Sequence, residues 1–229
     1  FALSLLGDYE SNAVLGRALV DRDRGVRSIA DSGIRELWCR VGSHDERELL
    51  ARVIQSNDER QHGEAARLAT ELIRKSRRPI AEAWCQRGIA HYHLGQYDSA
   101  IRDCNQALEI NPYHFTAAAG MGQCYMLQDN PVAALEAFRR ALRLNPGLEE
   151  VRAQVVRLQR SLRRDSLWPR RSGTRMAFDG LHPPANVTIS RGLFTQVPCV
   201  PRRDPPAAVS GPADRTRGDA AARTVPSAN

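Results

Sequence analysis

The sequence predicts an all-α protein, an α-solenoid of stacked antiparallel helix pairs followed by a disordered C-terminal tail. Three observations support this fold class. An apolar pattern with helical spacing recurs every 34 residues. Aromatic residues make up only 6% of the chain, so a core has to be built from the aliphatic residues that suit helices. Proline is rare before residue 165, whereas residues 165–229 contain nine of the thirteen prolines.

The first expected element is a helix pair within residues 1–40, with residues 5–19 as its first helix. The second helix follows the acidic turn at residues 21–23 and opens with Val26 and Arg27. This pattern resembles a HEAT-type repeat, in which an acidic turn caps a helix that begins with Val-Arg. A single pair of this kind would be the remnant of a longer array if upstream sequence is missing.

Residues 46–80 are predicted to form a degenerate first repeat. Its first helix is expected at about residues 46–58, and its second helix carries the same apolar spacing as the later copies, starting at Ala65. The next copy follows after 35 rather than 34 residues, so one residue is inserted near residues 77–80.

Residues 81–114 and 115–146 are predicted to form two clear repeats. The apolar motif of the first returns 34 residues later in the second: Ala100-Ile101-x-x-Cys104-x-x-Ala107-Leu108 and Ala134-Leu135-x-x-Phe138-x-x-Ala141-Leu142. This spacing puts the apolar side chains on one face of a helix, and the alanines let two helices pack closely and antiparallel. Asn130-Pro131 is a favourable helix start.

The last ordered element expected is a capping helix at residues 147–164. Apolar residues continue there at helical spacing, with arginines on the other faces, as suits the end of an array. Residues 165–229 lack glutamate and apolar periodicity and are rich in proline and arginine. This composition predicts a disordered tail.

The units resemble tetratricopeptide repeats, whose pattern is W-x2-L-G-x2-Y, then A-x3-F, then P. Matching residues in the first clear unit are Trp84, Gly88, Ala100 and Pro112, and in the second Gly122, Tyr125, Ala134, Phe138 and Pro146. Departures from the pattern are Arg87, His91 and Cys104 in place of Leu, Tyr and Phe, and Ala118 in place of Trp.

The resemblance implies a superhelix whose first helices line a concave groove that holds a peptide or a helix of another protein. The groove positions that it implies are Ile54, Asn57, Glu82, Cys85, Ile89, Tyr92, His93, Thr116, Ala119, Gln123 and Met126. Some family members hold a C-terminal carboxylate with lysines and asparagines. The matching positions here are Cys85, Ile89 and Gly120, so a clamp of that kind is not expected.

No catalytic motif is apparent, so we expect a non-enzymatic interaction scaffold with no cofactor and no metal. His91 and His93 are two residues apart and point to different faces of a helix, without a third ligand one turn away. Cys85, Cys104 and Cys124 occupy repeat positions that pack in a core.

Nucleic-acid binding by the arginine-rich segment 152–175 is the alternative function. The net charge is +7, and the densest basic stretch contains Arg157, Arg160, Arg163, Arg164, Arg170, Arg171 and Arg175. Apart from Trp168 it lacks aromatic residues for base stacking, which favours a protein partner.

No apolar run reaches the roughly 18 to 20 residues of a membrane span, and we expect a cytoplasmic protein. The chain opens at Phe1 rather than methionine, so the true N-terminus is expected to be missing.

Overall fold

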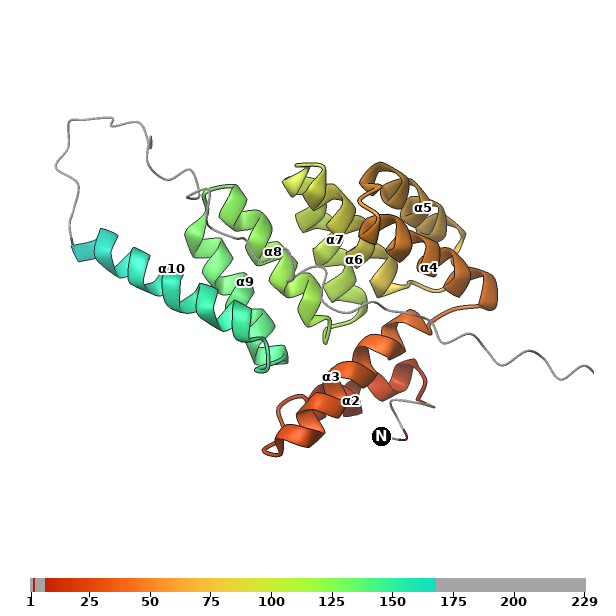
Figure 1. The fold of residues 1–229 in the computed structure, drawn as a ribbon, viewed down its shortest axis with the longest axis horizontal. Helices are drawn as coiled ribbons and strands as arrows, with labels where there is room; N and C mark the ends of the chain where they lie inside the picture. Colours follow the sequence, from red (N-terminus) through yellow and green to blue (C-terminus); the bar gives the residue numbers. More distant parts are fainter. Residues whose placement is uncertain (1, 3–6, 168–229) are drawn as a thin grey trace, which may run out of the picture.

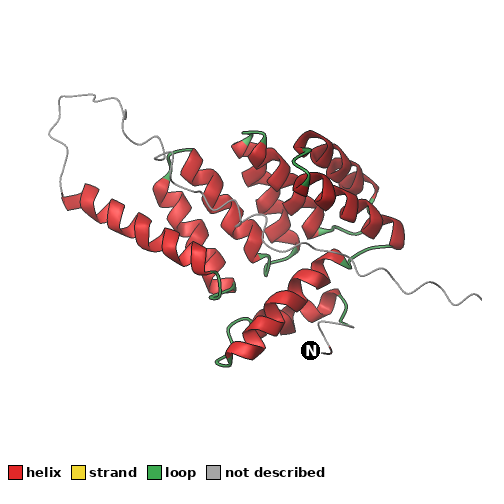
Figure 2. Ribbon diagram, viewed as in Figure 1, coloured by secondary structure: helices red, strands yellow, loops and turns green. Residues whose placement is uncertain are grey.

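The computed structural model describes residue 2 and residues 7–167 of the chain, and this part is built from helices joined by short loops (Figures 1 and 2). The elements are η1 (Tyr9–Ser11), α2 (Asn12–Ala18), α3 (Arg24–Cys39), α4 (His44–Asp58), α5 (His62–Lys75), α6 (Ala81–His93), α7 (Tyr97–Ile110), α8 (Phe115–Leu127), α9 (Pro131–Leu144) and α10 (Glu149–Leu167). The predicted all-α solenoid of helix pairs is confirmed. The predicted disordered tail lies outside the described residues, except that α10 continues to Leu167.

Helices α4–α5, α6–α7 and α8–α9 form three consecutive pairs joined by the same kind of turn. In each turn one residue adopts a positive φ: 63° at Arg60, 75° at Gly95 and 54° at Asp129. The amide of the following residue donates to the carbonyl five residues earlier, at 2.8, 2.8 and 2.9 Å respectively. This left-handed closure is a common way to end a helix. The pair α4–α5 therefore has the same local geometry as the two pairs whose sequences match the repeat pattern clearly.

Helix starts are set by side chains close in sequence. At the start of α4 the Ser43 hydroxyl accepts from the amide of Glu46 at 3.3 Å, and the Glu46 carboxylate accepts from the amide of Ser43 at 2.7 Å. This reciprocal capping box satisfies two backbone donors, and the bond from the Ser43 amide lowers the pKa of Glu46. At the start of α9 the Asn130 side chain accepts from the amide of Ala133, and Pro131 is the first helical residue.

The main core extends from α6 to α10 and depends on small residues where helices meet. The four alanines of the two apolar motifs, Ala100, Ala107, Ala134 and Ala141, are fully buried. Gly122 on α8 lies so close to α9 that an added Cβ atom would be 2.5 Å from the Phe138 ring. Contacts this close bury apolar area between helix backbones and explain why so few aromatic residues suffice.

The two N-terminal helices form a pair with its own core, and the turn between them has the features of the HEAT-type pattern. The Asp23 carboxylate accepts from the amides of Gly25 and Val26 at 2.6 and 3.1 Å, and so caps α3. The Arg27 guanidinium donates to the carbonyls of Asp21 and Arg22. The first helix is shorter than expected, because α2 begins only at Asn12 and is preceded by the single turn η1.

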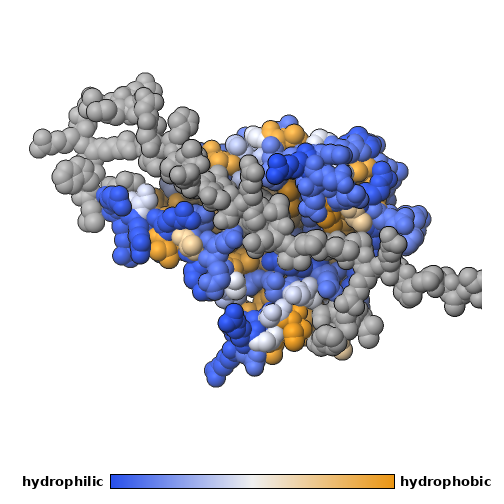
Figure 3. Space-filling view, in the orientation of Figure 1, coloured by the Kyte–Doolittle hydropathy of each residue, from blue (hydrophilic) through white to orange (hydrophobic). Residues whose placement is uncertain are grey.

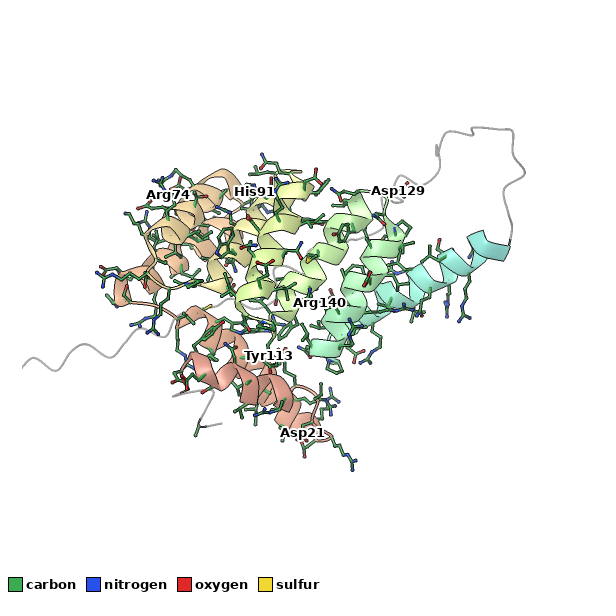
Figure 4. The ribbon with its side chains drawn as sticks, turned by 180° about the vertical axis from the view of Figure 1, so that it is seen from behind. Asp21, Arg74, His91, Tyr113, Asp129 and Arg140 are labelled. Carbon is green, nitrogen blue, oxygen red and sulfur yellow. The ribbon has the colours of Figure 1, made fainter. Side chains whose placement is uncertain are left out.

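This N-terminal pair lies across one edge of the repeats instead of stacking ahead of α4 as a preceding layer (Figure 1). Phe115, at the start of α8, belongs to the core of the pair, and Asn145, in the α9–α10 loop, donates to Asp31 at 2.5 Å. Tyr113, labelled at this junction in Figure 4, packs its ring against Gly16. The aromatic side chains at the turns of the repeats therefore hold the pair at this edge.

None of the helices formed by the described residues has both the length and the apolar character needed to cross a bilayer.

Candidate partner-binding groove

The predicted groove is formed by α4, α6 and α8, which are the first helices of the three pairs. Ile54, Ile89 and Gln123 occupy one repeat position on these helices, and Asn57, Tyr92 and Met126 occupy the position one turn later. Because the pairs share the same turn geometry, equivalent positions lie side by side in the array.

Seven of the eleven positions predicted to line the groove are buried: Ile54, Asn57, Glu82, Cys85, Ile89, Ala119 and Gln123. The other four reach solvent, His93 and Met126 more than Tyr92 and Thr116. The cause of the burial is close packing, since Cys85, Ile89 and Ala119 belong to the main core. The accessible positions are mainly at the C-terminal ends of α6 and α8.

The N-terminal ends of α6 and α8 are occupied by contacts with α3. Glu82, near the start of α6, lies 3.0 Å from Nε2 of the fully buried His114. The Trp38 ring of α3 stacks on the His114 ring, with 4.1 Å between centroids and 16° between planes. Arg35 of α3 donates to the Thr116 hydroxyl at 3.4 Å and lies over the Phe115 ring. The helix α3 therefore covers the side of the groove formed by the N-terminal ends of α6 and α8, where Glu82 and Thr116 lie.

Sequence reasoning missed the part played by α3. Trp38 and Arg35 follow an ordinary amphipathic pattern on their own helix, and the residues they contact are about 80 positions away. The one available signal was the unusual set of aromatic rings between two helices, at residues 113–115.

On the opposite side of the groove, toward the C-terminal ends of α4 and α6, a group of aromatic and amide side chains joins α4 and α5 to α6. The Asn57 amide donates to the Gln86 carbonyl at 3.0 Å, and its oxygen lies 3.3 Å from Nδ1 of His62. The His62 and His93 rings are stacked with 4.3 Å between centroids, and the Tyr92 ring meets His93 edge-on. Burial, together with the positive charge of Arg60, lowers the pKa of His62.

The three repeat cysteines are buried in the core, as their repeat positions predicted. Cys85, Cys104 and Cys124 are free thiols. Burial raises the pKa of Cys85 and Cys104 well above the ordinary value and that of Cys124 to about 12. Thiols of this kind stay protonated at neutral pH and are poor nucleophiles.

His91 and His93 point to different neighbours, as their spacing predicted. His91 contacts Gln96 at 2.6 Å and lies 3.7 Å from Asp103, whereas His93 stacks on His62. In the part of the chain that the structure describes, no group of three or more His, Cys, Asp or Glu side chains is placed to hold a metal ion.

The arginine-rich segment is divided by the limit of the described residues. Arg157, Arg160, Arg163 and Arg164 are exposed on α10. The other arginines of the predicted basic stretch, Arg170, Arg171 and Arg175, lie outside the described residues together with Trp168.

The fold is that of a helical-repeat scaffold for protein–protein interaction. Residues 81–114 and 117–148 match the sequence profile of the tetratricopeptide repeat family. These two segments are therefore tetratricopeptide repeats, and the resemblance seen in the sequence is confirmed for this part of the chain.

Relatives of known sequence match parts of the chain. A Protein SGT1 homolog of Bos taurus is 37% identical over 79 residues, which are 34% of this chain and 23% of that protein. A TPR repeat-containing protein of Rhizobium etli is 27% identical over 142 residues, or 62% of this chain and 69% of that protein. The match to the human SGT1 homolog covers 18% of its length, so the chain spans less than a quarter of these SGT1 relatives.

Solved structures share the fold at low sequence identity. The Sgt2 TPR domain from Aspergillus fumigatus has a TM-score of 0.51 and 15% identity, over 58% of this chain and 88% of that one. The first TPR of Spaghetti (RPAP3), bound to the HSP90 peptide SRMEEVD, has a TM-score of 0.50 and 20% identity, over 54% of this chain and 97% of that one.

Proposed function

We propose that this protein is a non-enzymatic, cytoplasmic scaffold that binds an extended segment of another protein along the groove of α4, α6 and α8. The observation that carries the proposal is the uncharged lining of its middle. Of the predicted groove positions on α6 and α8, only Glu82 has an acidic side chain, and it is buried against His114. Charged residues make up 26% of the chain, whereas the accessible positions Tyr92, Thr116 and Met126 have uncharged side chains.

The partner segment would contact the half of the groove that α3 leaves uncovered. That half contains Tyr92, His93, Gln123 and Met126, near the C-terminal ends of α6 and α8. Met126 is 40% exposed, and methionine adapts its shape to varied apolar partners. The RPAP3 domain, which has the same fold, is bound to a peptide. An apolar side chain of the partner packed on Met126 is therefore the central contact that we propose.

Site-specific crosslinking tests the location of this contact. A photoreactive benzophenone amino acid in place of Met126 should capture the partner in cells when the full chain is irradiated. The matched control carries the same group in place of Val132, which is 64% exposed on α9 and does not belong to the groove. Capture of one specific protein at position 126 and not at position 132 is the expected result.

Binding measurements on the captured partner complete the test. Met126→Glu places a carboxylate at an apolar contact and should weaken binding at least about tenfold, which corresponds to about 1.4 kcal/mol. Val132→Glu should leave the affinity unchanged. Equal crosslinking at both positions, or an affinity that is indifferent to Met126→Glu, would place the interaction elsewhere on the molecule.

A further inference from the structure

Helix α10 continues the rotational register of the first helices of the repeats, although no second helix follows it among the described residues. Residues 34 positions apart are buried together: Ala83, Ala117 and Val151 in one set, and Ala90, Cys124 and Leu158 in another. Two matched sets of buried positions determine which way a helix is turned. The remaining faces of α10 are therefore equivalent to those of α6 and α8.

This register places arginines of α10 at groove positions. Arg157 is equivalent to Ile89 and Gln123, and Arg160 is equivalent to Tyr92 and Met126. Arg164 lies one turn beyond Arg160 on the same side. These three residues, called the arginine stripe below, extend over about 10 Å of helix, since each residue advances about 1.5 Å.

The arginine stripe is exposed and forms no ion pair with another described residue. Some other arginines are matched locally, as Arg67 is by Glu64 at 2.6 Å and Arg87 by Asp103 at 2.7 Å. Figure 3 shows the visible surface of α10 as mostly hydrophilic, consistent with a charged face. Like charges at this spacing repel one another, so an acidic ligand would be attracted to them.

The charges along the groove are therefore unequal at its two ends. The end at α4 carries the exposed carboxylate of Asp58 at the position equivalent to His93. The middle is uncharged at the accessible positions Tyr92 and Met126, and the end at α10 carries the arginine stripe.

Building on the proposed groove function, we infer that the arginine stripe selects the partner: it binds acidic residues that flank the apolar residue held at Met126. A carboxylate that accepts hydrogen bonds from a guanidinium forms one of the stronger polar contacts in proteins. The acidic end of the bound segment lies toward α10, because Asp58 would repel it at the other end.

A peptide fits this surface better than a nucleic acid does. Residues 149–164 contain no aromatic side chain on which a base could stack. The stripe is short, and the groove positions next to it on α8 and α6 are uncharged, so the stripe does not continue along the groove as a line of cations for a phosphate backbone. Glu149 and Glu150 at the start of α10 add negative charge.

Fluorescence anisotropy with two designed peptides tests the inference on the full chain. The probe is a labelled, end-capped peptide of repeated Leu-Glu-Glu triplets, and its neutral counterpart has Leu-Gln-Gln triplets. The wild-type chain should bind the acidic peptide at least about tenfold more tightly, because the three guanidinium groups together attract carboxylates and not neutral amides. This preference should shrink as the salt concentration rises.

Paired variants assign the preference to the stripe. Arg157→Gln/Arg160→Gln should abolish the tenfold preference without changing the melting temperature, because both side chains are exposed. The control Arg139→Gln/Arg143→Gln removes the same amount of charge from exposed positions on α9 and should retain the tenfold preference. Equal binding of the two peptides by the wild-type chain, or equal losses in the two variants, would overturn the inference. The inference would also be overturned if a mixed-sequence single-stranded oligonucleotide bound more tightly than the acidic peptide and this binding required the arginine stripe.

Failure of the inference can be told apart from failure of the groove proposal. If a partner crosslinks at position 126 but binds Arg157→Gln/Arg160→Gln as tightly as the wild-type chain, only the inference about the arginine stripe is contradicted. The reverse outcome would support the arginine stripe and contradict the groove proposal. In that case the stripe is still needed to bind the acidic peptide, Met126→Glu does not change this binding, and no partner crosslinks at position 126.

Discussion

Arg87 stands at a position where the repeat pattern has leucine, and its neighbours explain how the fold accepts it. Its guanidinium donates to both oxygens of Asp103 on α7, at 2.8 and 2.7 Å, and lies over the Trp84 ring, 4.7 Å from the centroid. In the next repeat the two equivalent positions hold Met121 and Ala137. A charged pair in one repeat therefore replaces an apolar pair in the other, and both fill the same space between helices.

We predict that Arg87→Met lowers the free energy of unfolding by about 3–5 kcal/mol, because it leaves the buried Asp103 carboxylate without its main partner. The double variant Arg87→Met/Asp103→Ala copies the second repeat and should recover most of the loss. Urea unfolding followed by circular dichroism measures both. A single variant that loses less than about 0.5 kcal/mol would mean that the pair contributes little in solution.

At the scale of single elements, α10 has one face in the core and one in solvent. Val151, Val155 and Leu158 are buried against the repeats, whereas Val156 is 40% exposed on another side of the helix. The apolar residues on the buried face cover the last pair, α8–α9, and the arginines keep the other faces hydrated. This arrangement is what the sequence predicts for a capping helix.

We predict that Val151→Asp detaches α10 and lowers the melting temperature, because it buries an unpaired carboxylate at a cost of about 3 kcal/mol. Val156→Asp introduces the same charge on an exposed face and should change stability by less than about 0.5 kcal/mol. Hydrogen exchange should localise the loss of protection in Val151→Asp to α10 first. Matching melting curves for the two variants would refute the docking of α10 described above.

At the scale of the whole molecule, the N-terminal pair joins parts of the array that are far apart in sequence. Trp38 of α3 donates from its indole nitrogen to Asn12 at 2.8 Å and packs against both His114 and Phe115. On the same edge, Asp31 accepts from Asn145, and the Tyr9 hydroxyl donates to the Ile110 carbonyl. The pair thus connects the successive turns between repeats, which would otherwise contact only their neighbours.

Trp38→Ala should lower stability by about 3–5 kcal/mol, the usual cost of deleting a large buried aromatic side chain. It should also turn a single unfolding transition into two, since the N-terminal pair would no longer be coupled to the repeats. Ile29→Ala, on a side chain that is 44% exposed on the same helix, is the control and should have little effect. A single transition at an unchanged temperature in Trp38→Ala would argue against this coupling.

The helices and their order could be read from the sequence because neighbours along the chain determine them. The alanine motifs of α7 and α9, the Asn130-Pro131 start and the 34-residue period all act within a few turns of helix. The same register also determined which positions, such as Gln123 and Met126, were predicted to line the groove.

The tertiary structure decided which predicted groove residues are exposed to solvent and where the N-terminal pair lies. Glu82 and Gln123 were predicted as groove residues from their repeat positions, yet both are buried, whereas Met126 is exposed. The docking of Trp38 on His114 joins residues 76 positions apart, which no local pattern encodes. Periodicity determines which face of a helix is apolar, but the surface that covers this face depends on three-dimensional packing between distant segments.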